Sequence, residues 1–440
     1  MKKLKIAVVG SGISGLSCSW LLSKAHDVTL FEAENRLGGH SHTVDVGNVP
    51  IDVGFIVFNE KTYPNLTALL RHLDVPTTDT AMGFSVSLDE GRFEYSGGSL
   101  AGLFGSPRLA MSQSHWRMLG DITRFYRSAK ALSQGIGDDV TLEQFLAANN
   151  FSEVFIKRHL VPMASAIWSS KPDQMLDYPA KAFIDFFDNH QLLKLGARDN
   201  WKTVSGGSIC YVNKIISSGI AVRKGDAVVQ VLRDDEGGTG GVTVKLASGM
   251  VAQFDHVVLA CHADQALAML ARPRGDEVDL LGRFHYSNNR VVLHRDPKLM
   301  PAGRRHWSSW NYVGSPESDA CGVTYWMNAL QSLPTDTQHF VSLNPARTAD
   351  IASVDTEINC THPIFTPKTL QAQKSLWQLQ GVNRTWFCGS YFGAGFHEDG
   401  LQAGLAVAEQ LGGVARPWTV ARPSGRIHLA GAASNQIAAE

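Results

Sequence analysis

Three glycines near the start of the chain have the spacing of a phosphate-binding turn. Gly10, Gly12 and Gly15 follow the short apolar run 6–9 and precede apolar residues at helical spacing over 16–22. In a strand–turn–helix unit the first glycine allows the tight turn, the second lets the backbone approach a pyrophosphate, and the third lets helix and strand pack closely. The N–H groups at the helix start would then face the phosphates. The pattern predicts a dinucleotide site, and a ligand-free glycine turn is the alternative.

An acidic residue strengthens the dinucleotide interpretation. The run 27–31 reads as a second strand and ends in Glu32, which lies 22 residues after Gly10. A carboxylate at this distance suits a ribose 2′-hydroxyl and would repel a 2′-phosphate. Residues beside these positions are also expected to contact the cofactor, namely Ser11, Ser14 and Ala33.

A second glycine pair follows the acidic residue. Arg36, Gly38 and Gly39 match an R-x-G-G motif, and His40 comes next. The segment resembles the corresponding motif of the large flavoprotein superfamily that includes amine oxidases, protoporphyrinogen oxidase and phytoene desaturases. The resemblance implies FAD as the cofactor, with this segment continuing the pyrophosphate and ribityl site. The family often has arginine after the second glycine, where this chain has His40.

The C-terminal part carries the other half of the resemblance. Residues 385–389 read as a strand that ends in glycine, and 393–400 lead into a helix over 401–411. A helix N-terminus stabilises negative charge, which flavin acquires when it is reduced. The resemblance implies that the backbone of His397 contacts the flavin, and that Ser390 stands where an acid usually contacts the ribityl chain. Three more cofactor contacts are implied by it: Gly389, Phe396 and, in a strand that would present backbone groups to adenine, Val228.

Length and patterning predict two domains. The chain of 440 residues exceeds one compact core. The expected fold class is α/β, with a Rossmann-like FAD-binding domain and an inserted mixed α+β substrate domain, amine-oxidase-like. The FAD-binding domain is expected from residues 1–75, 205–275 and 376–413, and the substrate domain from 76–204 and 276–375. Residues 414–440, with prolines, glycines and alanines, are expected to form a loosely ordered tail.

The inserted regions are expected to shape the substrate site. Residues 76–204 show helical patterns with many aromatic residues, which fit either a helical core or the wall of a large apolar pocket. Strands over 290–294, 307–312 and 322–328 would form a sheet that covers the flavin. The pocket candidates are Trp168, Trp310 and Asn311. A glycine-rich turn at 237–241 is expected to join two strands of a hairpin.

Charge and cysteine content limit the kinds of partner and the cellular location that the sequence predicts. A net charge of −1 gives no indication of a nucleic-acid partner. The six cysteines include no C-x-x-C pair, which argues against a disulfide framework or a metal site and fits a reducing cytoplasm. No apolar run of 18 residues predicts a transmembrane helix. The expected location is therefore cytoplasmic, with peripheral contact at the inner face of the membrane left open, and the oligomeric state is not predicted.

Several segments resemble one bacterial branch of NAD/FAD-binding, amine-oxidase-like proteins more closely. They are residues 163–169, 189–190, 201–208, 309–312 and 395–400. Members of this branch often accompany cyclopropane-fatty-acyl-phospholipid synthases and related lipid methyltransferases. By resemblance alone, this implies an unsaturated or methylated fatty acyl substrate.

The expected chemistry is hydride transfer from a substrate carbon to flavin N5. Amine oxidases of the superfamily typically carry a lysine near N5, whereas the corresponding stretch 288–294 has none, which favours carbon–carbon desaturation or isomerisation over amine oxidation. The catalytic candidates are His397, Glu398 and Tyr312, since histidine needs little pKa shift to act near neutral pH. Glu398 and Asp399 could instead cap their helix. The alternatives are an amine oxidase that releases hydrogen peroxide and a non-catalytic binding protein on the same scaffold.

Overall fold

A computed structural model describes residues 2–429 apart from 98, 169, 191, 194–199, 234–239, 315–321, 346–350 and 352. Its first layer is a five-stranded parallel sheet with strand order β19-β13-β1-β2-β9. These strands are Thr385–Phe387, His256–Leu259, Lys5–Val9, Asp27–Glu32 and Ala221–Lys224. Nearly every residue of β1 and all of helix α1 (Ile13–Leu22) are buried, as a central parallel strand and its crossover helix require.

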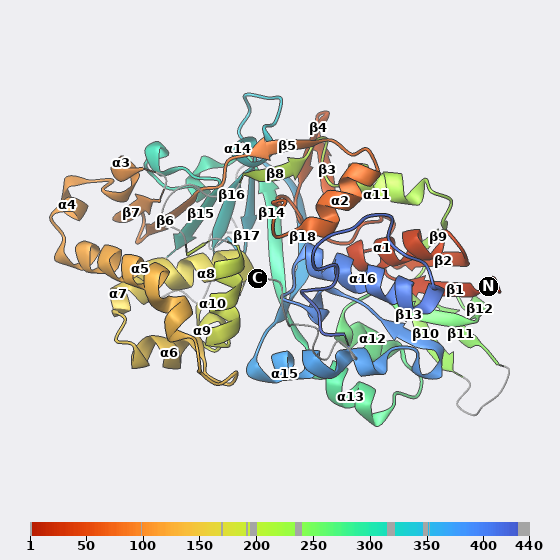
Figure 1. Ribbon diagram of the computed structural model, residues 1–440. Helices are drawn as coiled ribbons and strands as arrows, with labels where there is room; N and C mark the ends of the chain where they lie inside the picture. Colours follow the sequence, from red (N-terminus) through yellow and green to blue (C-terminus); the bar gives the residue numbers. More distant parts are fainter. Residues whose placement is uncertain are drawn as a thin grey trace.

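A second, seven-stranded sheet forms the other half of the molecule, with strand order β18-β14-β17-β16-β15-β6-β7. Its strands are Val354–Ile364, His285–His294, Phe340–Leu343, Val323–Trp326, Trp310–Gly314, Phe84–Leu88 and Phe93–Ser96. Figure 1 shows helices α5, α6, α8, α9 and α10 gathered at the far end of this half, and α1 and α16 with the parallel sheet at the opposite end. The long strands β14 and β18 run between the two.

The remaining elements connect and cover these layers. The major helices are α2 Pro64–His72, α5 Gln113–Leu132, α6 Leu142–Ala148, α8 Val161–Trp168, α9 Pro172–Leu176, α10 Ala180–Asn189, α11 Ile209–Ile216, α12 Ala263–Met269, α13 Gly275–Leu281, α14 Met327–Gln331, α15 Pro367–Leu376 and α16 His397–Gly412. Short helices are α3 Leu100–Leu103, α4 Pro107–Ala110, α7 Glu153–Phe155 and a π-helical turn over Ile156–Leu160. Small sheets pair β3 Thr43–Val46 with β4 Val49–Asp52, β5 Thr77–Thr80 with β8 Trp201–Val204, and β10 Val228–Arg233 with β11 Val242–Leu246 and β12 Val251–Phe254.

Two hydrophobic cores accompany the two large sheets. One joins the parallel sheet to α1 and α16, and the other joins the seven-stranded sheet to helices α5–α10. The predicted α/β class is confirmed. The two cores favour the predicted division into two domains, whose boundaries stay a prediction.

The predicted sheet over the flavin needs correction. The segment 307–312 becomes a strand only at Trp310, and 322–328 is a strand only to Trp326, after which α14 begins. An unpredicted strand, β17, separates β14 from β16, and β6 and β7 extend the sheet from a region read as helical. Residues 84–88 do alternate between apolar and polar types, which is a strand pattern, but they lie in a region whose other patterns were read as helical. In the structure the two serines of β6, Ser85 and Ser87, are buried and hydrogen-bonded.

Two further expectations meet different outcomes. Strands β10 and β11 pair antiparallel as the hairpin prediction requires, while positions 237–239 of its turn lie outside the described residues. The tail prediction is wrong for residues 414–429, which pack on the core. Trp418 stacks on Trp20 with ring centroids 5.7 Å apart, and Arg426 pairs with the buried Asp399.

Candidate functional site

The glycine turn has the geometry that its spacing predicts. Gly10 adopts a φ of +103°, which an L side chain rarely adopts. A Cβ on Gly15 would lie 1.8 Å from the carbonyl oxygen of Gly10, so strand and helix approach as closely as backbones can. Gly12 is the N-cap of α1, and a Cβ there would meet nothing within 4 Å. The space before the start of α1 is therefore open to a ligand.

The acidic residue at the end of β2 is fixed against this turn. Glu32 Oε2 accepts hydrogen bonds from the backbone N–H of Ser11 at 2.9 Å and from its hydroxyl at 2.5 Å, and Oε1 accepts from the N–H of Glu34. Ser11 is fully buried, and the next residue after the acid, Ala33, is exposed. The turn thus holds the carboxylate at the carboxyl edge of the parallel sheet, where ligands of such sheets bind.

The second glycine pair lies directly against the first turn. The N–H of Gly38 donates to the backbone oxygen of Ser11 at 3.1 Å, and a Cβ on Gly39 would lie 3.0 Å from Cα of Gly12. Arg36 donates to the carbonyl of Gly39 at 2.7 Å, so its guanidinium braces this turn. The two motifs, separate in sequence, form one backbone cradle.

Helix α16 begins on the far side of this cradle. A Cβ on Gly400 would lie 2.8 Å from the hydroxyl of Ser14, so the first turns of α16 and α1 are in contact. Gly389 and Ser390 follow β19 and lead into this helix start, with Phe396 as its N-cap. Val228 is buried at the start of β10, where a register shift between Val228 and Gln230 interrupts the ladder.

His397 is held by an aromatic stack and a hydrogen-bond chain. Its ring stacks on Phe55 at 3.9 Å, and Nε2 lies 2.8 Å from the hydroxyl of Tyr211, which in turn contacts the hydroxyl of Ser41. Burial lowers the pKa of His397 to about 3. The imidazole is therefore neutral near neutral pH, and its selection as an acid–base residue stays a prediction.

Glu398 is a structural residue, contrary to its selection as a catalytic candidate. It is fully buried, and its carboxylate accepts from the N–H groups of Asn65 and Leu66 and from the side-chain amides of Asn65 and Gln402. Glu398 therefore caps the start of α2, a different helix from the one that was expected. Asp399 caps α16 itself by accepting from the N–H of Phe396 at 2.7 Å.

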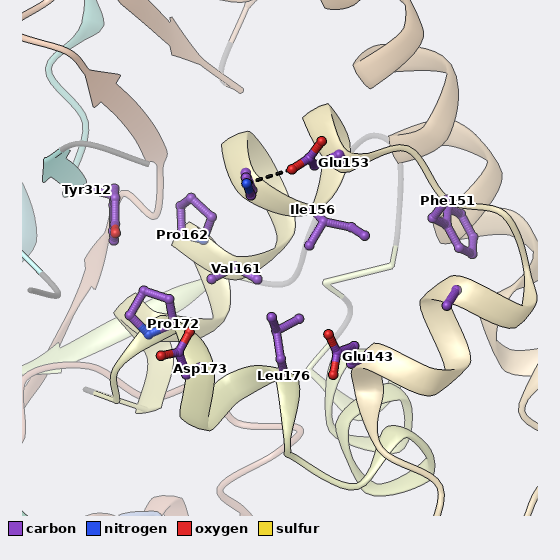
Figure 2. Close-up of a pocket in the computed structure, with 12 residues that line it drawn as sticks. Glu143, Phe151, Glu153, Ile156, Val161, Pro162, Pro172, Asp173, Leu176 and Tyr312 are labelled. Atoms are coloured by element: carbon purple, nitrogen blue, oxygen red, sulfur yellow. Dashed lines mark ion pairs between the residues drawn. The ribbon is translucent and has the colours of Figure 1, made fainter. Parts of the chain in front are cut away.

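Tyr312 and Asn311 lie on β15, in the seven-stranded sheet. Asn311 is fully buried and hydrogen-bonds within that sheet, to Ser85, Ser308 and Thr324, which leaves it no free role in a pocket. Tyr312 lines a cavity of about 400 Å³ among α6, the π-helical turn, α8 and α9, as Figure 2 shows. None of the predicted cofactor residues lines this cavity.

Aromatic side chains from the helical half reach the start of α16. Trp168 packs on Phe186 with ring centroids 4.5 Å apart, and Phe186 stacks on Phe396 at 4.7 Å. His190 also stacks on Phe186, with ring centroids 3.9 Å apart, and its ring lies 5.8 Å from that of Phe396. Trp310 instead packs edge-on against Tyr325. Of the predicted pocket residues, Trp168 therefore lies near Phe396, and the rings of Trp168, Phe186 and Phe396 form an aromatic wall at the start of α16.

A histidine cluster closes the space between the cradle and β18. The ring of His40 lies 5.2 Å from that of His362, and His262 and His397 are near enough to oppose its protonation. The side chain of His40 is accessible to solvent, and yet protein atoms lie on all sides of it. It therefore faces a space inside the molecule. Burial, chiefly, and the proximity of the other histidines and of Arg36 lower the pKa of His40 to about 3. No sequence pattern predicted that His362 lies here, because β18 is more than 300 residues away from the R-x-G-G segment in the chain.

Comparisons with known proteins agree with this geometry. The model of the family described as flavin containing amine oxidoreductase matches residues 13–436. The chain belongs to this family. The open space before Gly12 beside a fixed Glu32 fits the FAD that this flavin-containing family binds. No helix among the described residues is long and apolar enough to span a membrane.

Solved structures share the fold at low sequence identity. A CLA-producing fatty acid isomerase from P. acnes superposes with a TM-score of 0.66 at 15% identity, covering 93% of this chain and 98% of that one. Putrescine oxidase bound to putrescine gives 0.67 at 15% identity, with 93% and 99% coverage. Coproporphyrinogen III oxidase of Mycobacterium bovis is 27% identical over 179 residues, 37% of this chain and 36% of that protein. The matched stretches thus span only about a third or less of the curated relatives.

Proposed function

We propose that this FAD-dependent oxidoreductase takes hydride from an apolar substrate, an unsaturated or methylated fatty acyl chain. The observation that carries the proposal is the aromatic wall of Trp168, Phe186 and Phe396 at the start of α16. Such a wall buries an acyl chain and limits the entry of water. A fatty acid isomerase has the same fold.

The charges near the start of α16 also favour an uncharged substrate. Asp399 is paired with Arg426 at 2.5 Å, and Glu398 is surrounded by N–H donors. These carboxylates are therefore occupied and do not offer an ammonium group a counter-charge. The neutral histidines His40 and His397 likewise add no negative charge.

The residues have separate expected roles in the reaction. Bound FAD supplies the hydride acceptor. The backbone at Gly12 and Gly39 would hold its pyrophosphate, Glu32 its ribose, and the start of α16 would stabilise negative charge through the helix dipole. The aromatic wall would orient the chain of the substrate against His397.

Amine oxidation is the second candidate, favoured by the family description and by the putrescine oxidase fold. One experiment separates the two. The FAD-loaded protein is mixed anaerobically with vesicles of a cis-unsaturated phospholipid, of a fully saturated phospholipid, or with putrescine, and the flavin absorbance is followed. We expect bleaching with the unsaturated lipid alone. Bleaching by putrescine, with peroxide on admission of air and none with lipid, would reject the proposal.

A further inference from the structure

His362 lies where the two halves of the molecule meet. It is near the end of β18, with its ring 5.2 Å from His40 of the R-x-G-G segment. The adjacent Thr361 contacts His262, which follows strand β13 at the carboxyl edge of the parallel sheet. The ring therefore borders the space that the FAD residues surround, although no sequence motif marks it.

A chain of amide hydrogen bonds ends on this ring. The backbone N–H of Arg290 donates to Asn344 Oδ1 at 2.9 Å, and Asn344 Nδ2 donates to Asn289 Oδ1 at 2.7 Å. Asn289 Nδ2 then lies 2.8 Å from His362 Nδ1. Asn289 is 2% exposed, so this network is shielded from water that could rearrange it.

The backbone N–H of Arg290, the first group in this hydrogen-bond chain, fixes the orientation of all the groups that follow. A backbone N–H can only donate, so Asn344 must present its oxygen to Arg290 and its amide nitrogen to Asn289. Asn289 must accept with its oxygen and donate with its nitrogen. His362 Nδ1 therefore accepts, and in the neutral ring the proton is on Nε2. Burial and His262 lower the pKa of His362 to about 4, so the ring is neutral at physiological pH.

The position of the proton on His362 decides whether this residue can bind a metal together with its neighbours His40 and Cys360 or instead donates a hydrogen bond. Ligand atoms of His40, Cys360 and His362 lie within 4.8 Å of one another, a spacing that a metal ion could bridge. A metal needs a free lone pair on each ligand nitrogen. On His362 the Nδ1 lone pair is engaged by Asn289 and Nε2 carries the proton, so this residue can donate a hydrogen bond but cannot ligate a metal.

We propose that Asn344 and Asn289 hold His362 as a neutral Nε2–H donor that hydrogen-bonds to bound FAD. His362 is then a cofactor-binding residue, and the two asparagines are positioning residues that act through it. The proposal rests on the membership of the flavoprotein family and is independent of the substrate.

The tautomer is directly measurable. Holoprotein labelled with ¹⁵N-histidine is studied by long-range ¹H–¹⁵N correlation spectroscopy, and the His362 signals are assigned by their loss in His362→Gln. We expect a proton on Nε2 and none on Nδ1, and a shift of the Nε2–H signal when FAD is titrated into the apoprotein. A proton on Nδ1 in the wild type, or signals that FAD leaves unmoved, would overturn the proposal.

Asn344→Asp tests the relay at a residue that does not touch His362. The carboxylate still accepts from Arg290 but faces Asn289 with a second oxygen. Asn289 relieves this by turning its amide, which presents its oxygen to Nδ1 and gives up its 3.3 Å bond to the backbone oxygen of Ser287. We expect a proton to appear on Nδ1 of His362. Asn359→Asp is the matched control, because Asn359 pairs in register with Arg290 on β18 and is exposed. An unchanged tautomer in Asn344→Asp, or an equal change in the control, would contradict the relay.

FAD affinity gives an independent readout. His362→Leu removes the donor, and we expect FAD to bind about fivefold more weakly, the value of one neutral hydrogen bond. His362→Gln keeps an N–H and should bind FAD within about twofold of the wild type. Adding Zn²⁺ to the apoprotein should leave the His362 signals unchanged. Wild-type affinity in the leucine variant, or a Zn²⁺ complex with His362 as a ligand, would refute the proposal.

Discussion

The cradle side and the histidine side of the candidate site are built in different ways. On the cradle side, Gly10, Gly12 and Gly39 bring backbone atoms close together, and the ligand would meet N–H groups. On the histidine side, His362 and His397 are oriented by side chains from distant strands and helices. The cradle needs glycines because a side chain would block the close approach of backbone atoms. The histidine side needs particular side chains because each histidine is oriented by its hydrogen-bond partner.

This difference decides what the sequence reveals. A glycine requirement leaves a spacing in the chain, so the cradle could be predicted from residues 10–15 and 36–39. A hydrogen-bond chain such as Asn344–Asn289–His362 joins residues 55 and 73 positions apart and leaves no pattern. The following predictions test whether the two sides respond as differently as their construction implies.

The largest effect is expected for Gly15→Ala. Its Cβ would overlap the carbonyl oxygen of Gly10, which cannot move without distorting the turn, so we expect a loss of about 3 kcal/mol of stability and of detectable FAD binding. Denaturant unfolding and flavin fluorescence measure both.

Gly12→Ala is the matched control within the same motif. Its φ of −64° suits alanine and its Cβ meets no protein atom, so stability should change by less than about 0.5 kcal/mol. FAD affinity should nevertheless fall, because the methyl group occupies the approach of the pyrophosphate. Wild-type FAD affinity in Gly12→Ala would show that the pyrophosphate does not approach Gly12, and a stability loss equal to that of Gly15→Ala would show that the space at Gly12 is not open.

A smaller effect is expected for Glu398→Gln. The amide nitrogen would replace one of the two accepting oxygens and face the N–H of either Asn65 or Leu66, and burial leaves no water to replace the lost bond. We expect a loss of about 2 kcal/mol in the free energy of unfolding. Glu143→Gln, exposed on α6, should leave that free energy unchanged.

The Glu398 variant also separates a structural from a catalytic role. Turnover of the remaining folded protein should stay near that of the wild type. Full stability with lost turnover would instead make Glu398 a catalytic acid and reverse its assignment as the cap of α2.

The smallest effect is a pH dependence confined to the histidine side. The pKa of His397 is lowered to about 3 in the folded protein against an ordinary value near 6.5, so its neutral form stabilises the fold above pH 6.5. This contribution is lost as the pH falls toward 3. Between pH 7.5 and 5.5 the wild type should lose about 1.4 kcal/mol relative to His397→Gln. A parallel pH profile for the two proteins would show that the ring is not desolvated.

Like the site, the fold has parts that the sequence predicts and parts that it does not. The strand–turn–helix unit at the N-terminus and the helix after Gly400 carry apolar periodicity, and both were predicted. Strand β6 was missed although Phe84–Leu88 alternates between apolar and polar residues, because this five-residue pattern lies within a region whose other patterns are helical. The order of residues 414–429 was missed because it depends on Arg426 reaching Asp399, a contact that composition does not reveal.

The most direct test of the account is a crystal structure of the FAD-bound protein. We predict the pyrophosphate at Gly12 and Gly39, the ribose at Glu32, the N–H of His397 within hydrogen-bond distance of the flavin, and His362 Nε2 donating to the cofactor. FAD bound away from this cradle, or a flavin that contacts neither His397 nor His362, would contradict the account.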